Sequence, residues 1–149
     1  MVTIQRTDPT DPDLLSLVRK LDVYLNEIFG DLQADYDQYN SLQELDAVVI
    51  AYIGEQPIGC GCFKAFDEQR VEIKRMFVDP AHRGSGVANQ IVDELEAWAN
   101  EDGYTGAVLE TGLRMPDAMR FYEKCGYQLI NNYGQYAGNE NSICFGKRL

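Results

Sequence analysis

The sequence predicts a mixed α/β fold in which one central, largely antiparallel sheet carries helices on both faces. Three observations lead to this prediction. Short apolar, β-branched runs lie between turn residues, and longer segments carry apolar residues at helical spacing. The order along the chain is strand, helical region, three strands, helix, strand, helix and two strands. The 149 residues show no linker or internal repeat, so we expect one domain over residues 1–149.

The N-terminal segment predicts a strand followed by a helix. Alternating apolar and polar residues over 2–6 indicate a short strand. Asp11 and Pro12 then supply an N-cap and a proline at the first helical position, and Gly30 marks the end of the helix. The apolar residues at helical spacing are Leu14, Leu17, Val18, Leu21, Leu25 and Ile28. For residues 31–45, a short helix and a loop both remain open.

Three strands follow as a series of hairpins, over residues 47–53, 58–66 and 71–78. Turn residues at 54–57 and 67–70 separate them. The first of these strands is apolar without polar alternation, which is typical of a strand covered on both faces.

The C-terminal half predicts two helices and three strands. One helix covers residues 84–100 and carries an apolar stripe, and the other covers residues 116–124. The strands cover 107–110, 127–130 and 142–145. Between the last two strands, many turn residues predict a mobile loop.

Composition limits the classes of function. The formal net charge of −11 argues against general nucleic-acid binding, which depends on phosphate neutralisation by Lys and Arg. Two interpretations of the acidic surface remain open: an ordinary solvated surface, or one that attracts a cationic substrate. The N-terminus lacks the pattern of a signal peptide, and no apolar run approaches the ~18 residues that cross a membrane. We therefore expect a cytoplasmic protein with no membrane partner.

The cysteine pattern also favours a cytoplasmic protein. The chain has four cysteines, no CxxC pair and a single histidine, His82, so no metal site is expected. We interpret the cysteines as reduced and mostly buried thiols, as in a cytosolic protein.

The most informative segment is a glycine-containing turn between the strand over 71–78 and the following helix. The amides at a helix N-terminus are unpaired and carry partial positive charge, so anions bind there. Glycines let the backbone approach a phosphate, and an arginine adds a fixed charge. Neither the dinucleotide pattern nor the nucleoside-triphosphate pattern is present. The residues of this candidate phosphate turn are Arg83, Gly84, Ser85, Gly86, Val87 and Ala88.

The motifs around this turn resemble the GNAT acetyltransferase family. Arg83-x-x-Gly86-x-Ala88 matches the family's [QR]-x-x-G-x-[GA] motif, and residues 118–127 are similar to its second motif. Met115 departs from the polar residue that many relatives carry. The resemblance covers about residues 46–130. It implies acetyl-CoA as co-substrate, with its pyrophosphate on the turn and its pantetheine arm in a gap beside the strand over 71–78. Backbone groups at Met76, Phe77 and Val78 would hold that arm.

The resemblance also implies direct attack by a primary amine on the thioester. Tyr122 is then the candidate general acid, against the plainer interpretation of a core tyrosine. Glu72 is the candidate base, acting through a water molecule. Glu110 is the alternative base, and Glu72 could instead pair with Lys74 or Arg70 or face the solvent.

The acceptor, an amine on a small molecule or a protein, is the least defined partner. Aromatic candidates for its pocket are Tyr24, Phe29, Tyr36, Tyr39, Tyr133 and Tyr136, and acidic candidates for steering a cation are Asp31, Asp35 and Asp37. The family frequently forms pairs, so a homodimer is one expectation. The alternative function is an acyl-CoA-binding regulatory module without catalytic turnover.

Overall fold

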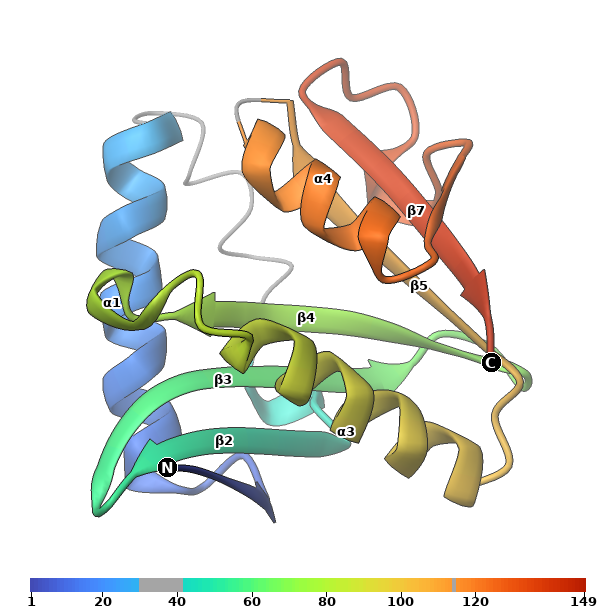
Figure 1. Ribbon diagram of the computed structural model, residues 1–149. Helices are drawn as coiled ribbons and strands as arrows, with labels where there is room; N and C mark the ends of the chain where they lie inside the picture. Colours follow the sequence, from blue (N-terminus) through green and yellow to red (C-terminus); the bar gives the residue numbers. More distant parts are fainter. Residues whose placement is uncertain (30–41, 114) are drawn as a thin grey trace.

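A computed structural model describes residues 1–29, 42–113 and 115–149, without the side chains of Phe29 and Gln43. Seven strands form a single sheet in the order β1-β2-β3-β4-β5-β7-β6 (Figure 1). All neighbouring pairs are antiparallel except β4 and β5. The strands are β1 (Val2–Thr7), β2 (Ala47–Ile53), β3 (Gln56–Ala65), β4 (Arg70–Val78), β5 (Gly106–Gly112), β6 (Gln128–Ile130) and β7 (Ser142–Arg148). This topology confirms the predicted mixed, largely antiparallel sheet.

Helices cover both faces of the sheet, as predicted. Helix α1 (Pro12–Phe29) packs on one face, and α3 (Val87–Glu101) and α4 (Pro116–Lys124) lie on the other (Figure 1). Three short 3-10 turns are η2 (Leu42–Glu44), η3 (Pro80–His82) and η4 (Gly134–Tyr136). None of the helices in these described ranges is long and apolar enough to cross a membrane.

Each helix layer buries its own apolar core. On the α1 side, leucines of α1 pack on the sheet residues Val48, Ile50, Cys60, Cys62 and Phe77. On the other side, the predicted stripe of α3 is buried except for Trp98, which is partly buried, and Gly61 lets that helix approach closely. A Cβ at Gly61 would lie 2.7 Å from the Ile91 side chain. Strand β4, the fourth of the seven strands in the sheet, contributes residues to both apolar cores.

Local signals in the sequence are confirmed at α1 and β2. The Asp11 carboxylate accepts a hydrogen bond of 2.8 Å from the Asp13 N–H, as an N-cap does. Strand β2 is buried at every position from Ala47 to Tyr52, as expected for a strand covered on both faces. All four cysteines are free thiols, and Cys125 is the one that is only half-buried.

Four boundaries differ from the prediction by two residues or more. Strand β7 ends at Arg148 rather than at residue 145, because it pairs with β5 as far as Gly106. Strand β3 begins at Gln56, because Gln56 already pairs with Ile53 across the turn. Strand β5 extends to Gly112, because it continues to pair with β7. Helix α3 begins at Val87 rather than at residue 84, since Gly84 and Gly86 have φ angles of +82° and +86°.

The segment predicted as a mobile loop is cross-linked by hydrogen bonds. The side-chain amide of Asn132 donates to the carbonyls of Tyr136, Asn139 and Ser142 at 3.2, 3.1 and 3.0 Å. These bonds fold the segment around η4 and hold it against the ends of β6 and β7.

Candidate active site

The sheet opens between β4 and β5. The two strands pair only from Arg70 and Gly106 to Ile73 and Leu109. Beyond that point β4 continues along β3, and β5 continues along β7, so the two strands separate (Figure 1). Over residues 74–78, the side of β4 that faces β5 has no strand partner in the described part of the chain. An extended ligand can add to such an edge, as the resemblance implies.

A bulge at Arg75 reshapes β4 at the opening. The register against β3 shifts between Cys60 and Cys62, which adds one residue to β4, and Arg75 has a φ of 59°. Consequently the Arg75 guanidinium reaches Asp22 of α1 at 2.8 Å, while Met76 packs on the α3 side. The bulge was not predicted, because it depends on the pairing register rather than on a local sequence pattern.

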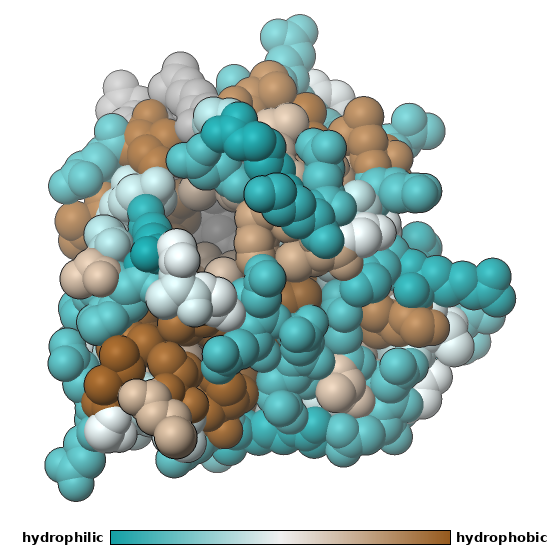
Figure 2. Space-filling model, in the orientation of Figure 1, coloured by the Kyte–Doolittle hydropathy of each residue, from teal (hydrophilic) through white to brown (hydrophobic). Residues whose placement is uncertain are grey.

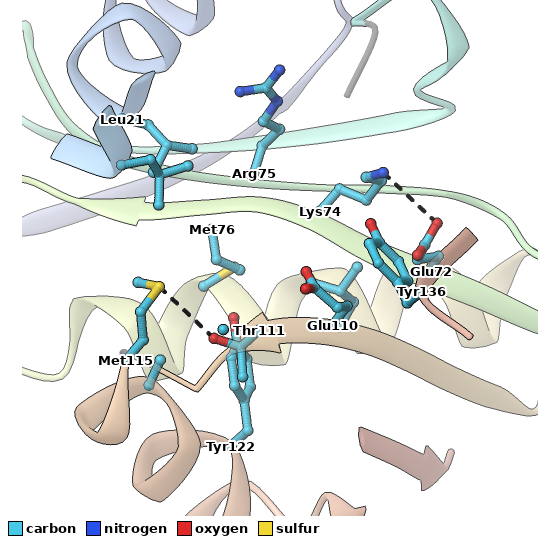
Figure 3. Close-up of a pocket in the computed structure, with 14 residues that line it drawn as sticks. Leu21, Glu72, Lys74, Arg75, Met76, Glu110, Thr111, Met115, Tyr122 and Tyr136 are labelled. Carbon is cyan, nitrogen blue, oxygen red and sulfur yellow. Dashed lines mark hydrogen bonds and ion pairs between the residues drawn. The ribbon is translucent and has the colours of Figure 1, made fainter. Parts of the chain in front are cut away.

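A cavity of about 150 Å³ lies in this opening. Figure 2 shows the surface hollowed at this position, between β4 and α4. One end is mostly apolar and is lined by Leu21, Leu25, Met76, Met115, Ala118 and Tyr122. The other end is polar, with Glu72 and Lys74 from β4, Glu110 from β5 and Tyr136 from the loop before β7 (Figure 3).

Tyr122 lies at the apolar end and rises from α4 toward β5 (Figure 3). Its ring packs edge-on against Phe121 and Tyr127, with centroids 5.1 and 5.9 Å away. Burial raises the pKa of the Tyr122 hydroxyl, with smaller contributions from Cys125 and Glu110. The hydroxyl carries its proton at neutral pH, as a tyrosine of ordinary pKa also does, so a proton is available for transfer.

Glu72 is only 3% exposed and lines the polar end. Its Oε2 accepts a hydrogen bond of 2.7 Å from the Tyr133 hydroxyl, and its Oε1 lies 3.9 Å from the Lys74 ammonium. Of the pairings considered from the sequence, the one with Lys74 is present. Arg70 instead pairs with Asp67 at 2.7 Å.

Glu110 is the second carboxylate of the cavity. The Ser142 hydroxyl donates to its Oε2 at 2.6 Å. Burial raises the pKa of Glu110 to about 7, while the Ser142 hydrogen bond and Lys74 act in the opposite direction. Near neutral pH the carboxyl group therefore exists in both protonation states, as a general base requires.

Lys74 places an ammonium group in the same cavity. The residue is 8% exposed, and burial lowers its pKa, while Glu72 acts in the opposite direction. Sequence reasoning considered Lys74 only as a partner of Glu72. Lys74 follows Glu72 by two residues on one strand, so both side chains lie on the same face of the sheet. This spacing could have predicted Lys74 as a site residue.

The predicted phosphate turn has the geometry that an anion requires. Gly86 is the N-cap of α3 and offers no side-chain cap, and no acidic residue occupies the first turn. A Cβ at Gly84 or Gly86 would meet no atom within 4 Å, so the backbone faces open space. Ser85 turns back and donates to the His82 carbonyl at 2.6 Å. The first-turn amides, including those of Val87 and Ala88, are available to a diphosphate.

Arg83 supports this turn from the side. Its Nε donates to the Val78 carbonyl at 2.8 Å, and its guanidinium lies 4.7 Å from the ring centroid of Tyr24 and 5.8 Å from that of Phe77. The arginine therefore ties α1 and the end of β4 to the turn.

The structure brings some of the acceptor-pocket candidates to the cavity. Tyr136 lines it, and Tyr133 reaches it through Glu72. Tyr24 packs on Arg83 instead. Six further candidates lie outside the described residues: the Phe29 side chain, Asp31, Asp35, Tyr36, Asp37 and Tyr39. Ser142, Leu21 and Leu25 were not predicted as site residues, because only the fold brings them to the opening.

Comparison with known proteins gives a consistent result. The Acetyltransferase (GNAT) family matches residues 14–127. The IAA acetyltransferase of Azospirillum brasilense is 28% identical over 99% of this chain and 98% of its own length. A crystal structure from Klebsiella pneumoniae, of a candidate acyl-CoA N-acyltransferase, superposes with a TM-score of 0.84 at 27% identity, covering 100% of this chain and 98% of that one.

A more distant structure shows the same fold with a ligand. It is a GNAT family acetyltransferase from Elizabethkingia anophelis with acetyl-CoA bound, which has a TM-score of 0.74 at 19% identity. The alignment covers 99% of this chain and 98% of that one.

Proposed function

Because the chain belongs to the GNAT family of acetyltransferases, we propose that it transfers an acetyl group from acetyl-CoA to a primary amine. The observation that carries this proposal is the separation of β4 from β5 next to the uncapped N-terminus of α3. One feature accepts an extended arm and the other accepts a diphosphate, so together they fit coenzyme A. We place the reaction in the cytoplasm, where the four thiols stay reduced.

The donor would be bound mainly by backbone groups. Amides from Gly84 to Ala88 face the open space in front of α3 and fit the pyrophosphate. The free edge of β4 at Met76, Phe77 and Val78 fits the pantetheine arm. A backbone N–H on this edge can also donate to the thioester carbonyl, and one such donor is worth about 3 kcal/mol of barrier.

The reaction needs a neutral amine and a proton for the leaving sulfur. The amine nitrogen forms a bond to the acetyl carbon, and the carbon–sulfur bond breaks with its electron pair on sulfur. A carboxylate removes the first proton from the ammonium group, Tyr122 donates a proton to the sulfur, and the second proton of the nitrogen returns through water to Tyr122. The products are an N-acetyl amide and free coenzyme A.

Two carboxylates in the cavity are candidates for the base. Glu72 is the residue selected from the sequence, but its Oε2 already accepts a hydrogen bond from the Tyr133 hydroxyl and its Oε1 lies 3.9 Å from the Lys74 ammonium. Glu110 has a pKa of about 7 and lies between Tyr122 and Lys74 (Figure 3). We therefore propose Glu110 as the base, and keep Glu72 as the alternative.

Substitution of Tyr122 by Phe tests the acid. We expect kcat to fall about 100-fold, because the sulfur loses its proton donor, while the affinity for acetyl-CoA stays near that of the wild type. Release of free thiol measures turnover, and calorimetric titration measures binding. Tyr127→Phe is the matched control, because its hydroxyl donates to Glu96 outside the cavity.

Three outcomes distinguish the candidate functions. Normal turnover in Tyr122→Phe would remove this residue from the mechanism. Binding of acetyl-CoA by the wild type without product from any amine would favour the acyl-CoA-binding regulatory module. Absence of binding would contradict both functions.

A further inference from the structure

The loop before β7 supplies side chains to the cavity, although its composition is that of a mobile turn. Residues 131–141 are rich in asparagine and glycine, and both glycines have positive φ angles, 52° and 79°. Nevertheless Tyr136 is only 3% exposed and lines the polar end of the cavity, and the Tyr133 hydroxyl donates to Glu72. The placement of these side chains therefore depends on what holds the loop.

The side chain of Asn132 closes this loop. Its amide nitrogen donates to three carbonyls at 3.2, 3.1 and 3.0 Å, those of Tyr136, Asn139 and Ser142. A carboxamide has two N–H groups, so at least one of them is shared between two carbonyls. The three carbonyls belong to the end of η4, the following turn and the first residue of β7. One side chain thus ties three points of the loop together.

Two of the three tied residues serve the cavity. Tyr136 lies beside Glu72 at the polar end (Figure 3). The Ser142 hydroxyl donates to Oε2 of Glu110 at 2.6 Å. Ser142 also forms the last pair of the β5–β7 ladder, opposite Gly112, and the ends of ladders open most readily. The bond from Asn132 to the Ser142 carbonyl therefore supports the backbone at the point where the hydroxyl must stay in place.

The ionisation of Glu110 depends on this hydroxyl. Burial raises the pKa of Glu110 to about 7, and the hydrogen bond from Ser142 is the largest contribution in the opposite direction. The other titratable groups around the carboxyl lie on β4, α4, η4 and β7, and they are Glu72, Lys74, Tyr122, Tyr136 and Cys144. Displacement of the Ser142 hydroxyl would raise the pKa of Glu110 further, because a donor to the charged form would be lost.

We infer that Asn132 is a positioning residue of the active site, which holds Ser142 against Glu110 and Tyr136 in the wall of the cavity. The inference rests on the proposed function, since it concerns the base and the acceptor side of the same site. Asn132 does not line the cavity itself, so it acts through these two residues.

Direct titration of Glu110 tests the inference without turnover. In protein with isotope-labelled glutamate carboxyls, NMR follows the Glu110 signal, which is identified by its absence in Glu110→Gln. We expect the titration midpoint to rise by about one pH unit in Ser142→Ala, which removes the donor, and to rise in Asn132→Ala, which displaces it. The double variant should shift no further than Ser142→Ala alone, because both changes act on one hydrogen bond.

Kinetics give the second readout. In Asn132→Ala, the inflection of kcat/KM should follow the titration midpoint, and KM for the amine should rise about tenfold as Tyr136 loses its support. KM for acetyl-CoA should stay near the wild-type value. Asn132→Gln keeps the donor on a longer side chain, so we expect an intermediate shift. If no amine were acetylated, the proposed function would fail, whereas the NMR titration would still decide the role of Asn132.

Asp8→Ala is the matched control. Asp8 holds the turn before α1, where it accepts from the Thr10 N–H at 2.8 Å and from the Thr10 hydroxyl, at the other edge of the sheet from β7. This variant should melt earlier than the wild type but leave the Glu110 titration and KM for the amine unchanged. An unchanged Glu110 midpoint in Asn132→Ala, the same shift in Asp8→Ala, or additive shifts in the double variant would overturn the inference.

Discussion

At the scale of a single residue, the ionised form of Glu110 that can act as a base is opposed by the burial of its carboxyl group. Its burial in the cavity raises the pKa to about 7 from an ordinary value of 4.5, and Ser142 limits that rise by donating a hydrogen bond. The folded protein therefore holds this proton more tightly than the unfolded chain between these two values. The associated stability is fully present below about pH 4.5 and is lost as the pH rises through 7. The ionised form that can act as a base is thus the form that destabilises the fold.

This conflict predicts the behaviour of Glu110→Gln. The amide stays neutral at every pH, so we expect the variant to melt above the wild type at pH 8 and close to it at pH 5. Its turnover should fall about 100-fold, and the rise of kcat/KM through pH 7 that the wild type shows should disappear. Melting curves and pH–rate profiles measure the two effects.

Glu72→Gln is the companion variant. If Glu72 were the base, kcat would fall about 100-fold in Glu72→Gln and stay near the wild-type value in Glu110→Gln. If the wild type showed no inflection between pH 6 and 8, Glu110 would be excluded as the base.

Individual site residues could be predicted only where a motif carries them. Tyr122 follows from its spacing to Gly126 and Tyr127, and it lines the cavity. The grouping of Glu110, Lys74 and Ser142 depends on strand register, which brings together residues far apart in the sequence. No local pattern contains that information.

At the scale of elements, α3 has a matched glycine at each end. Gly86 begins the helix with a φ of +86°, and Gly103 follows its C-terminus with a φ of +94°. A Cβ at either position would meet no atom of the chain within 4 Å. The two glycines differ only in which end of the helix they serve, and only the N-terminal end attracts an anion.

Alanine at these two positions should separate strain from ligand binding. Both variants are expected to lose about 1–2 kcal/mol of stability, because a side chain is unfavourable at positive φ. Only Gly86→Ala should also weaken acetyl-CoA binding, by about tenfold, since it alters the backbone that meets the diphosphate. Urea unfolding and calorimetric titration give the two quantities. Equal affinities in the two variants would show that the turn does not bind the donor.

The periodicity of the sequence was sufficient to predict most of the elements. Helix α4 begins and ends at the predicted residues, because a proline, an apolar face and Gly126 define it locally. The predicted start of α3 is too early. The sequence does not show that the glycines before Val87 have positive φ angles, which are incompatible with a right-handed helix. The bulge at Arg75 could not be predicted, because it is a property of the β3–β4 pair. Local sequence therefore predicts whether a segment is a helix or a strand, but it does not predict the register in which two strands pair.

At the scale of the whole molecule, Arg6 ties the edge strand β1 to α3. Its guanidinium forms two bonds to Glu101, at 2.6 and 2.9 Å, and its Nε bonds to Glu94 at 2.6 Å. It also lies 5.0 Å from the ring centroid of Trp98, which packs on Phe63 of the core. The side chain of Arg6 thus joins the N-terminal strand to the C-terminal half of α3.

Removing this tie should cost more than removing a local pair. Arg6→Met leaves Glu94 and Glu101 without their cation in a chain of net charge −11, so repulsion adds to the lost contacts. We expect the midpoint of urea unfolding to fall at low salt, and to fall less at high salt because screening weakens the repulsion. Acetyl-CoA affinity should not change, because Arg6 lies away from the cavity.

Arg70→Met is the matched control for this effect. Arg70 also has a carboxylate partner and an aromatic one, with Asp67 at 2.7 Å and the Phe66 ring centroid at 5.0 Å, but all three belong to one turn. Its removal leaves a single exposed carboxylate without its cation, and the backbone N–H groups of residues 69 and 70 still donate to that carboxylate, so the loss of stability should be smaller. If Arg6→Met unfolded no earlier than Arg70→Met, or if its loss were independent of salt, packing of β1 on β2 would be enough to hold the edge of the sheet.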